Sequence, residues 1–319
     1  NYFVKDKKRI RAFTYGLSKD QSQSIEVVHA KKISDIYSTK WDQIDLKEYH
    51  DYINKWVEVY GFSSHLHGMY HIEFYSKILK KNEFCNTSFL SGIFGDIWAG
   101  SINYENIVNY QDVKNLGYSH GINLELKYLK KNSKDKLKQQ YFEEHKQHLE
   151  SDKIKAIFTI RMKLMLISYL TQIPEYFGMP VWTPFLNFDI VKSILNISDE
   201  RRKNRIWQRD FFNNNNLNLE DMNLKSTKGN KLDYETAQRA KLEKIDIELM
   251  GEYVNEGRLN EINKMLPSLT PFEKIKNQLL YVPKIGGVLR RLGFKNEYLK
   301  ALYEYYVIKS IEKGLKNEF

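Results

Sequence analysis

Residues 10–17, which read IRAFTYGL, open the part of the sequence that decides the fold. The run is short, apolar and aromatic, and Gly16 stands near its end, so it predicts a buried strand that stops at a turn. Apolar residues at helical spacing follow over 25–36, behind a serine suited to cap the helix. A second short strand is predicted at 41–46. The chain is therefore expected to begin as strand, helix, strand.

Two helical stretches and a third apolar run extend this pattern. The helices are predicted over 47–60 and 65–80, and the apolar run covers 87–90. The alternation predicts an α/β fold in which a parallel sheet is flanked by helices. Ligands of such sheets bind beyond the carboxyl ends of the strands. The turns at 16–18 and 91–92 follow two strands and mark the expected site.

The strand signal fades after residue 102, and the rest of the chain is expected to be mainly helical. Helices are predicted at 153–177, 189–197 and 199–212, and from 271 to the end with a break at Gly286-Gly287, while 227–231 has the composition of a loop. We therefore expect an α/β part over 1–230 and a helical C-terminal extension over 231–319.

The composition excludes several classes of protein. The 319 residues hold 50 Lys and Arg against 40 Asp and Glu, a net charge of +10, and 42% are hydrophobic, which excludes a disordered chain. The one cysteine, Cys85, excludes an intrachain disulfide framework and a thiolate zinc site. No run approaches about 18 apolar residues, so no membrane span is expected. With no apolar signal segment either, a cytoplasmic protein is expected.

The positive charge suits three kinds of partner: nucleic acid, an anionic membrane surface or a phosphate-bearing substrate. The lysine-rich run at 126–140 holds few acids, and such runs usually form a solvated surface. The sequence has no helix-turn-helix, zinc finger or aromatic RNA-binding signature. Nucleic acid is therefore not the expected partner.

Three segments carry a resemblance to a known family. They are Ala12-Phe13-Thr14-Tyr15-Gly16, then LSGIFGDIWAG at 90–100, then MPVWTPFLN at 179–187, after which Arg205 and Arg209 follow. In this order they resemble the synthetase domain of the asparagine synthetase family, ATP pyrophosphatases of the PP-loop type that include β-lactam synthetase and lasso-peptide cyclases. The second segment looks like the family's S-G-x-G-x-D-E turn, the third like its R-x-P-F-L-D segment, and the arginines stand where the family has K-x-x-x-R.

The resemblance, which covers roughly residues 9–230, implies a reaction. Members of the family adenylate a carboxylate with ATP and Mg²⁺, release pyrophosphate and pass the acyl group to an amine. The implied substrates are therefore a small-molecule or peptide carboxylate and an amine. Bacterial relatives act in natural-product and surface-polysaccharide pathways.

The resemblance also assigns roles to residues. It implies nucleotide contacts for Phe13, Thr14, Tyr15, Ser91, Gly92 and Arg209, Mg²⁺ binding for Asp96, catalysis for Arg205 and Lys228, and a substrate pocket at His67, Met69, Tyr70 and His71. The residue types suit these roles. A Ser-Gly turn lets backbone N–H groups approach phosphate because glycine has no Cβ. A carboxylate at a helix start can hold Mg²⁺ on phosphates, and two arginines one turn apart can neutralise a leaving pyrophosphate.

Plainer interpretations stay open for each of these residues. Asp96 can be a simple N-cap, the two arginines can be surface charge, and a lone Lys228 in a glycine loop is a weak signal. The three histidines between 65 and 71 can hold a metal, line a pocket or lie on an ordinary helix, although no HExxH pattern is present.

The sequence also departs from the family pattern. It contains no S-G-G-x-D-S nucleotide loop. Either a strand and this loop precede Asn1, which is the expectation here, or the loop is lost and the ATP chemistry with it. Ile93 and Ile97 stand where acids are expected. Val181-Trp182 and Asn187 replace the Arg and the Asp of the third segment, and Arg205 replaces a Lys. Cys85 does not match the N-terminal cysteine of the glutamine-hydrolysing domain. Asparagine synthesis itself is therefore not expected.

Three hypotheses about function follow. The first is an ATP-dependent amide-forming ligase or amidotransferase domain. The second, motivated by the lost acids at Ile93 and Ile97, is a catalytically degenerate relative that binds a partner protein. The third, motivated by the charge of +10, is a PP-loop enzyme that modifies tRNA, for which RNA binding with a steep salt dependence is required.

Overall fold

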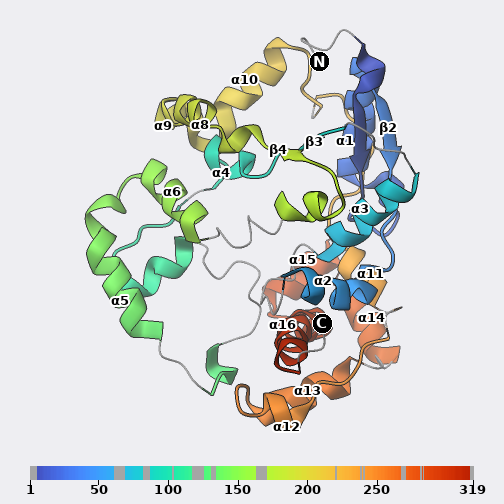
Figure 1. Ribbon diagram of the computed structural model, residues 1–319, viewed down its shortest axis with the longest axis vertical. Coiled ribbons are helices and arrows are strands. Elements are labelled where there is room, and N and C mark those ends of the chain that lie inside the picture. Colours follow the sequence, from blue (N-terminus) through green and yellow to red (C-terminus); the bar gives the residue numbers. More distant parts are fainter. Residues whose placement is uncertain are drawn as a thin grey trace. The chain divides into compact units, whose positions relative to one another are not determined.

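The computed structural model divides the chain into two compact units, and each is described by itself (Figure 1). It describes residues 6–60, 69–81, 87–102, 104–116, 126–130, 134–162, 171–219, 221–237, 239, 241–266, 271–280, 282 and 284–316. Unit 1 comprises Asn1–Tyr49, Tyr70–His120 and Ser133–Leu232, and unit 2 comprises His50–Met69, Gly121–Asn132 and Asp233–Phe319. The units thus interleave along the chain, whereas two contiguous segments were expected. The reason is visible in α2 (Ile53–Tyr60), which packs against the last helix of the chain and buries Trp56 and Val57.

The strands of unit 1 form two separate parallel pairs. β1 (Arg11–Thr14) pairs with β2 (Lys40–Gln43), with Arg11 opposite Lys40, and α1 (Ile25–Tyr37) makes the crossover. β3 (Phe89–Leu90) pairs in parallel with β4 (Val181–Trp182). The three strands predicted from the sequence are therefore confirmed. The fourth strand, β4, was not predicted from the sequence.

Helices make up most of the rest of unit 1. They are α3 (Met69–Lys81, whose first residue belongs to unit 2), α4 (Gly95–Ala99), α5 (Lys134–His145), α6 (Asp152–Met162), α8 (Phe188–Leu195), α9 (Asp199–Arg202) and α10 (Ile206–Asn214). The prediction of one continuous helix over 199–212 is wrong. Asn204 and Arg205 have φ values of 53° and 55°, in the left-handed region that a right-handed helix cannot contain, and they turn the chain between α9 and α10.

The core of unit 1 near the second strand pair surrounds α4. Phe94, Ile97 and Trp98 are buried together with Ala156 and Ile194. The indole Nε1 of Trp98 donates to the Phe185 carbonyl at 3.0 Å, which holds the segment after β4 against this helix. The ring of Phe185 also packs against this buried cluster.

Unit 2 is helical, as expected for the C-terminal part. Besides α2 it contains α11 (Leu232–Ala237), α12 (Ile247–Met250), α13 (Glu256–Met265), α14 (Pro271–Leu279), α15 (Ile285–Arg291) and α16 (Glu297–Leu315). α16 forms the centre of the unit, with Ala301, Leu302 and Ile308 fully buried. The predicted break at Gly286-Gly287 is wrong, since both glycines lie in the first turn of α15.

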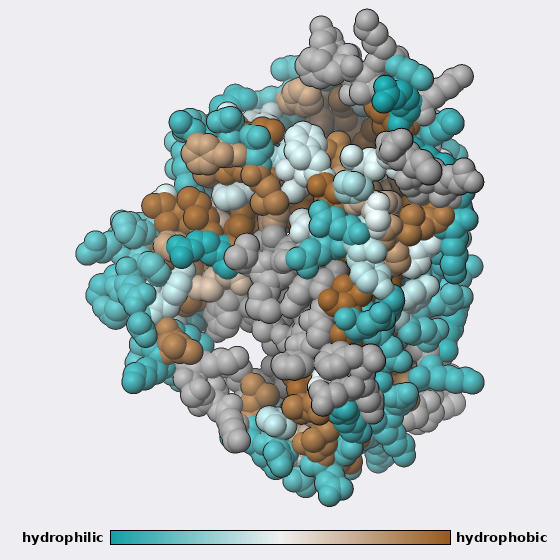
Figure 2. Space-filling model, in the orientation of Figure 1, coloured by the Kyte–Doolittle hydropathy of each residue, from teal (hydrophilic) through white to brown (hydrophobic). Residues whose placement is uncertain are grey.

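The surface agrees with the interpretation of the lysine-rich run. The described part of 126–140 is mostly exposed, and hydrophilic side chains cover α5 at the left of Figure 2. Within the described residues, no helix combines the length and the apolar character that crossing a bilayer requires.

Candidate functional site

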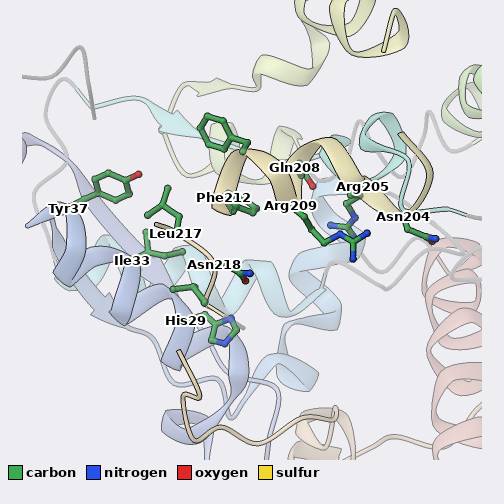
Figure 3. A pocket seen from close by; sticks show the side chains of 12 residues that line it. His29, Ile33, Tyr37, Asn204, Arg205, Gln208, Arg209, Phe212, Leu217 and Asn218 are labelled. Carbon is green, nitrogen blue, oxygen red and sulfur yellow. The ribbon is translucent and has the colours of Figure 1, made fainter. Parts of the chain in front are cut away.

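A cavity of about 650 Å³ opens in unit 1 between α1, α10 and the chain that follows α10 (Figure 3). Its lining consists of His29, Ile33, Tyr37, Asn204, Arg205, Gln208, Arg209, Phe211, Phe212, Leu217, Asn218 and Leu219. α1 contributes the positions i, i+4 and i+8, which share one helix face. α10 contributes its first two turns. The volume is in the range of small-molecule sites.

Arg205 and Arg209 make this cavity positively charged. Arg205 is the left-handed residue at the N-cap of α10, and Arg209 lies one turn further on, so both side chains reach the same cavity. Both are exposed, and no acidic side chain of the described residues pairs with either. The lining contains no Asp or Glu. Arg205 lies outside the helix, because its φ of 55° is left-handed, but both arginines line the same cavity, which is suited to an anion.

The other walls of the cavity are apolar and aromatic. Ile33, Phe211 and Phe212 are 42%, 55% and 41% exposed, so their apolar surfaces are accessible to a ligand. Tyr37 and Leu217 continue the surface. Flat aromatic faces next to guanidinium groups favour a ligand with an anionic part and a planar or apolar part.

The turn after β3 holds the next predicted residues. Ser91 is buried, and its backbone N–H donates to the Trp182 carbonyl at 2.9 Å. That N–H is therefore used by the sheet, and Ser91 can offer only its hydroxyl, which accepts from the N–H of Ile93 at 3.3 Å. Gly92 is exposed, with open space where a side chain would be.

Asp96 lies in the first turn of α4 and is exposed. The N-cap of this helix is Phe94, so the plain N-cap role considered for Asp96 is wrong. Among the described residues there is no group of three His, Cys, Asp or Glu side chains that could hold a metal. Asp96 can still serve Mg²⁺ as a single carboxylate, because this ion commonly takes its other ligands from phosphates and water.

One hydrogen bond joins α4, the helix of Asp96, to α10, which carries Arg209, and a second joins α4 to α9. The indole Nε1 of Trp207 on α10 donates to the Ala99 carbonyl at 3.1 Å, and Nη2 of Arg202 donates to the Trp98 carbonyl at 3.2 Å. Both carbonyls are at the end of α4. The position of α10 and its arginines is thereby tied to α4.

Tyr15, just beyond β1, lies against residues predicted for the substrate pocket. Its ring centroid is 5.4 Å from that of Tyr70 and 6.2 Å from that of His71, and its hydroxyl is 3.4 Å from Nε2 of His71. The structure thus brings these three predicted residues together. Met69 is 1% exposed and belongs to the core. His67 and Cys85 lie outside the described residues.

The remaining predicted residues are near the first strand pair. Thr14 accepts a hydrogen bond from Nε1 of Trp41 at 3.3 Å, and the guanidinium of Arg11 stacks 5.3 Å from the ring of Phe13. Lys228 is exposed in a loop that pairs with the start of α1. In that pairing, the N–H of Thr227 donates to the Gln23 carbonyl at 2.7 Å. The loop of Lys228 therefore lies beside the turn between β1 and α1.

Sequence reasoning missed the side chains that complete the cavity. His29, Tyr37, Phe212 and Asn218 were not predicted as site residues, although Figure 3 shows them around the same space as the arginines. The spacing of His29, Ile33 and Tyr37 could have indicated one face of a helix. No pattern in the sequence indicates that this face meets α10.

No family model matches the chain, and comparison with curated proteins and with solved structures finds no match either.

The packing around Tyr15 has a consequence at high pH. Burial raises the pKa of its phenol well above the ordinary value of 10.0, and the neighbouring Tyr70 raises it further. The unfolded chain ionises first as the pH rises, so Tyr15 lowers the free energy of unfolding between pH 10.0 and its folded pKa. We expect the free energy of unfolding of Tyr15→Phe to fall less steeply above pH 10.0 than that of the wild type. Urea unfolding at several pH values measures both slopes. Equal slopes would contradict burial of this phenol.

Proposed function

We propose that unit 1 binds ATP and that the protein is an ATP-dependent carbon–nitrogen ligase similar to the synthetase domain of asparagine synthetase. In this reaction a carboxylate attacks the α-phosphate of ATP and pyrophosphate leaves, and an amine then attacks the acyl-adenylate to form the amide while AMP leaves. The observation that carries the proposal is the acid-free cavity of Arg205 and Arg209, on a helix hydrogen-bonded to the helix of Asp96. A triphosphate needs this combination of cations and a carboxylate that can share Mg²⁺.

The arrangement of the strands also supports a PP-loop-type fold. Both strand pairs are parallel. The first segment that resembles the family forms most of β1 and the turn after it, and the second begins at the end of β3. Sites of open parallel sheets lie at these ends. The loop of Lys228 joins the same region through its backbone pairing at the start of α1.

The residues of the chain have separate tasks in this proposal. Arg205 and Arg209 bind the phosphates and stabilise the charge that grows on the leaving pyrophosphate. Lys228 adds a cation from the turn region. Asp96 would hold Mg²⁺, which supplies charge neutralisation on the phosphates. Tyr15 with Tyr70 and His71 forms an aromatic wall for the carboxylate substrate, which together with the amine is a small molecule or a peptide.

Isotope exchange between pyrophosphate and ATP tests this function, with the full-length protein and a panel of carboxylic acids. We expect exchange that depends on one acid and that falls at least about 100-fold in Arg205→Ala with Arg209→Ala. Arg201→Ala is the matched control, because Arg201 is exposed and pairs with Asp210 outside the cavity, so its exchange should stay unchanged. Full exchange in the double variant would contradict the proposal. So would a failure of every acid in the panel to support exchange, combined with no binding of Mg·ATP in calorimetry.

A binding module is the second candidate, and one observation favours it. Ile93 and Ile97 stand where the family has acidic residues, so Asp96 has no second carboxylate at either position. Ile97 is buried in the core. A degenerate relative would keep the cavity and lose the metal-assisted step. Calorimetry separates the two functions, since binding of ATP to the arginine cavity with no exchange for any acid supports the binding module.

A further inference from the structure

Unit 2 has an apolar surface that the proposed ligase chemistry does not use. Seven large apolar side chains on α14, α15 and their flanking residues are between 38% and 69% exposed: Ile275, Leu279, Val282, Ile285, Val288, Leu292 and Phe294. We call this surface the α14–α15 face. Single exposed apolar residues are ordinary on a protein, but a dense set on two consecutive helices marks an interaction surface.

The exposed side chains follow the helical period. Ile275 and Leu279 are at i and i+4 on α14, and Ile285, Val288 and Leu292 are at i, i+3 and i+7 on α15 and the turn that ends it. Each helix therefore presents an apolar stripe to solvent, where a surface helix normally presents polar residues. Asn277 is buried on the opposite side of α14, so the helix packs on its unit through another face.

The two helices are held together as one element. A Cβ on Gly286 would lie 2.1 Å from the Leu280 carbonyl oxygen, so α15 packs on the end of α14 at a distance that only glycine permits. Nη1 of Arg290 donates to the same carbonyl at 2.8 Å. The ammonium of Lys276 lies 5.7 Å from the ring centroid of Phe294. The stripes are thus presented in a fixed relation to each other.

The charge on the two helices and the segment between them is mostly positive, with Glu273 near the start of α14 as the one acidic residue in 271–296. Residues 275–296 contain no Asp or Glu and five cations: Lys276, Lys284, Arg290, Arg291 and Lys295. All except Lys276 are exposed, and none forms an ion pair with a described residue. An apolar stripe bordered by unpaired cations is complementary to a surface that is apolar inside and negative outside.

We propose that the α14–α15 face binds the surface of a membrane that contains anionic lipids. The aliphatic side chains would enter the boundary between headgroups and acyl chains, and the long Lys and Arg side chains would reach the phosphates. Short helices that lie in the plane of the membrane need no spanning segment. A protein interface fits less well, because the core of such interfaces is depleted of Lys and rich in aromatic residues, whereas this face is mainly aliphatic.

Sedimentation with lipid vesicles tests the proposal on the full-length protein. The probes are vesicles of equal parts phosphatidylcholine and phosphatidylglycerol, and vesicles of phosphatidylcholine alone. We expect binding to the anionic vesicles, at least about tenfold weaker binding to the neutral ones, and loss of binding at high salt. Val288→Ser with Leu292→Ser, and separately Arg291→Glu with Lys295→Glu, should each lower the partition coefficient at least about tenfold.

Matched controls use equally exposed residues of unit 1. Phe188→Ser removes a side chain that is 75% exposed, and Lys136→Glu with Lys225→Glu reverses two exposed charges, so both should bind vesicles like the wild type. Circular dichroism melting confirms that each variant folds. Absence of binding to anionic vesicles, or equal losses in test and control variants, would overturn the proposal. So would concentration-dependent dimerisation that Val288→Ser with Leu292→Ser abolishes without lipid, since it assigns the face to a second copy of the chain.

Discussion

Replacement of Glu73 by alanine is expected to lower the free energy of unfolding by about 3–5 kcal/mol. Glu73 is fully buried on α3, and its carboxylate accepts hydrogen bonds from the N–H groups of Lys47 at 2.9 Å and Glu48 at 3.0 Å. The ammonium of Lys77 pairs with the same carboxylate. Alanine would leave two backbone donors and a cation without their acceptor. Because 47–48 follow β2, their attachment to α3 shapes the carboxyl end of the first strand pair.

Urea unfolding with circular dichroism measures this effect. Glu58→Ala is the matched control, since Glu58 is also a helical glutamate paired with a lysine three residues away, but its side chain is 53% exposed. The control should change the free energy of unfolding by no more than about 0.5 kcal/mol. Similar losses in both variants would show that the burial of Glu73 adds nothing to its ion pair.

Gly100→Ala is expected to lower the free energy of unfolding by about 2–4 kcal/mol and to weaken binding of anions to the arginine cavity. Gly100 ends α4 with a φ of 84°, where a Cβ costs energy by itself. That Cβ would also lie 2.3 Å from the carbonyl oxygen of Arg202, a backbone atom that can move only if α9 moves. Displacement of α9 would also move the turn at Arg205 between α9 and α10. The free energy of unfolding and the affinity of the cavity for anions should therefore fall together.

Two other glycines separate the causes. Gly178 has a φ of 76° with open space at its Cβ position, so Gly178→Ala should show only the backbone cost of about 1–2 kcal/mol. Gly92→Ala has neither strain nor contact and should be close to neutral. Thermal unfolding and titration with inorganic pyrophosphate give the two readouts. If Gly100→Ala loses no more stability than Gly178→Ala, the close packing of α4 on Arg202 is refuted.

These expected results concern contacts between segments that are distant in the sequence, and such contacts mark the limit of sequence reasoning here. The apolar run at 10–17 predicted β1, and the spacing over 25–36 predicted α1, which the structure has at Ile25–Tyr37. The continuous helix predicted at 199–212 is instead broken at Asn204 and Arg205. No pattern of apolar or polar residues in 199–212 marks this break.

The candidate site was likewise predicted only in part from the sequence. Arg205 and Arg209 were predicted as a pair because four positions make one helical turn, and they line one cavity. The aromatic walls of that cavity were not predicted, since Tyr37 and Phe212 come from helices far apart in the chain. The loop of Lys228 was predicted, while its pairing with Gln23 was not.

Periodicity and composition are local or additive properties, so they were enough to predict the order of strands and helices over roughly the first ninety residues, the lack of a disulfide framework and the positive charge. The pairing of β4 with β3, the interleaving of the two units and the acid-free cavity between α1 and α10 appear only in the folded chain. The physical reason is that such pairings depend on which apolar faces are buried against each other, and a face becomes defined only once its helix or strand has formed.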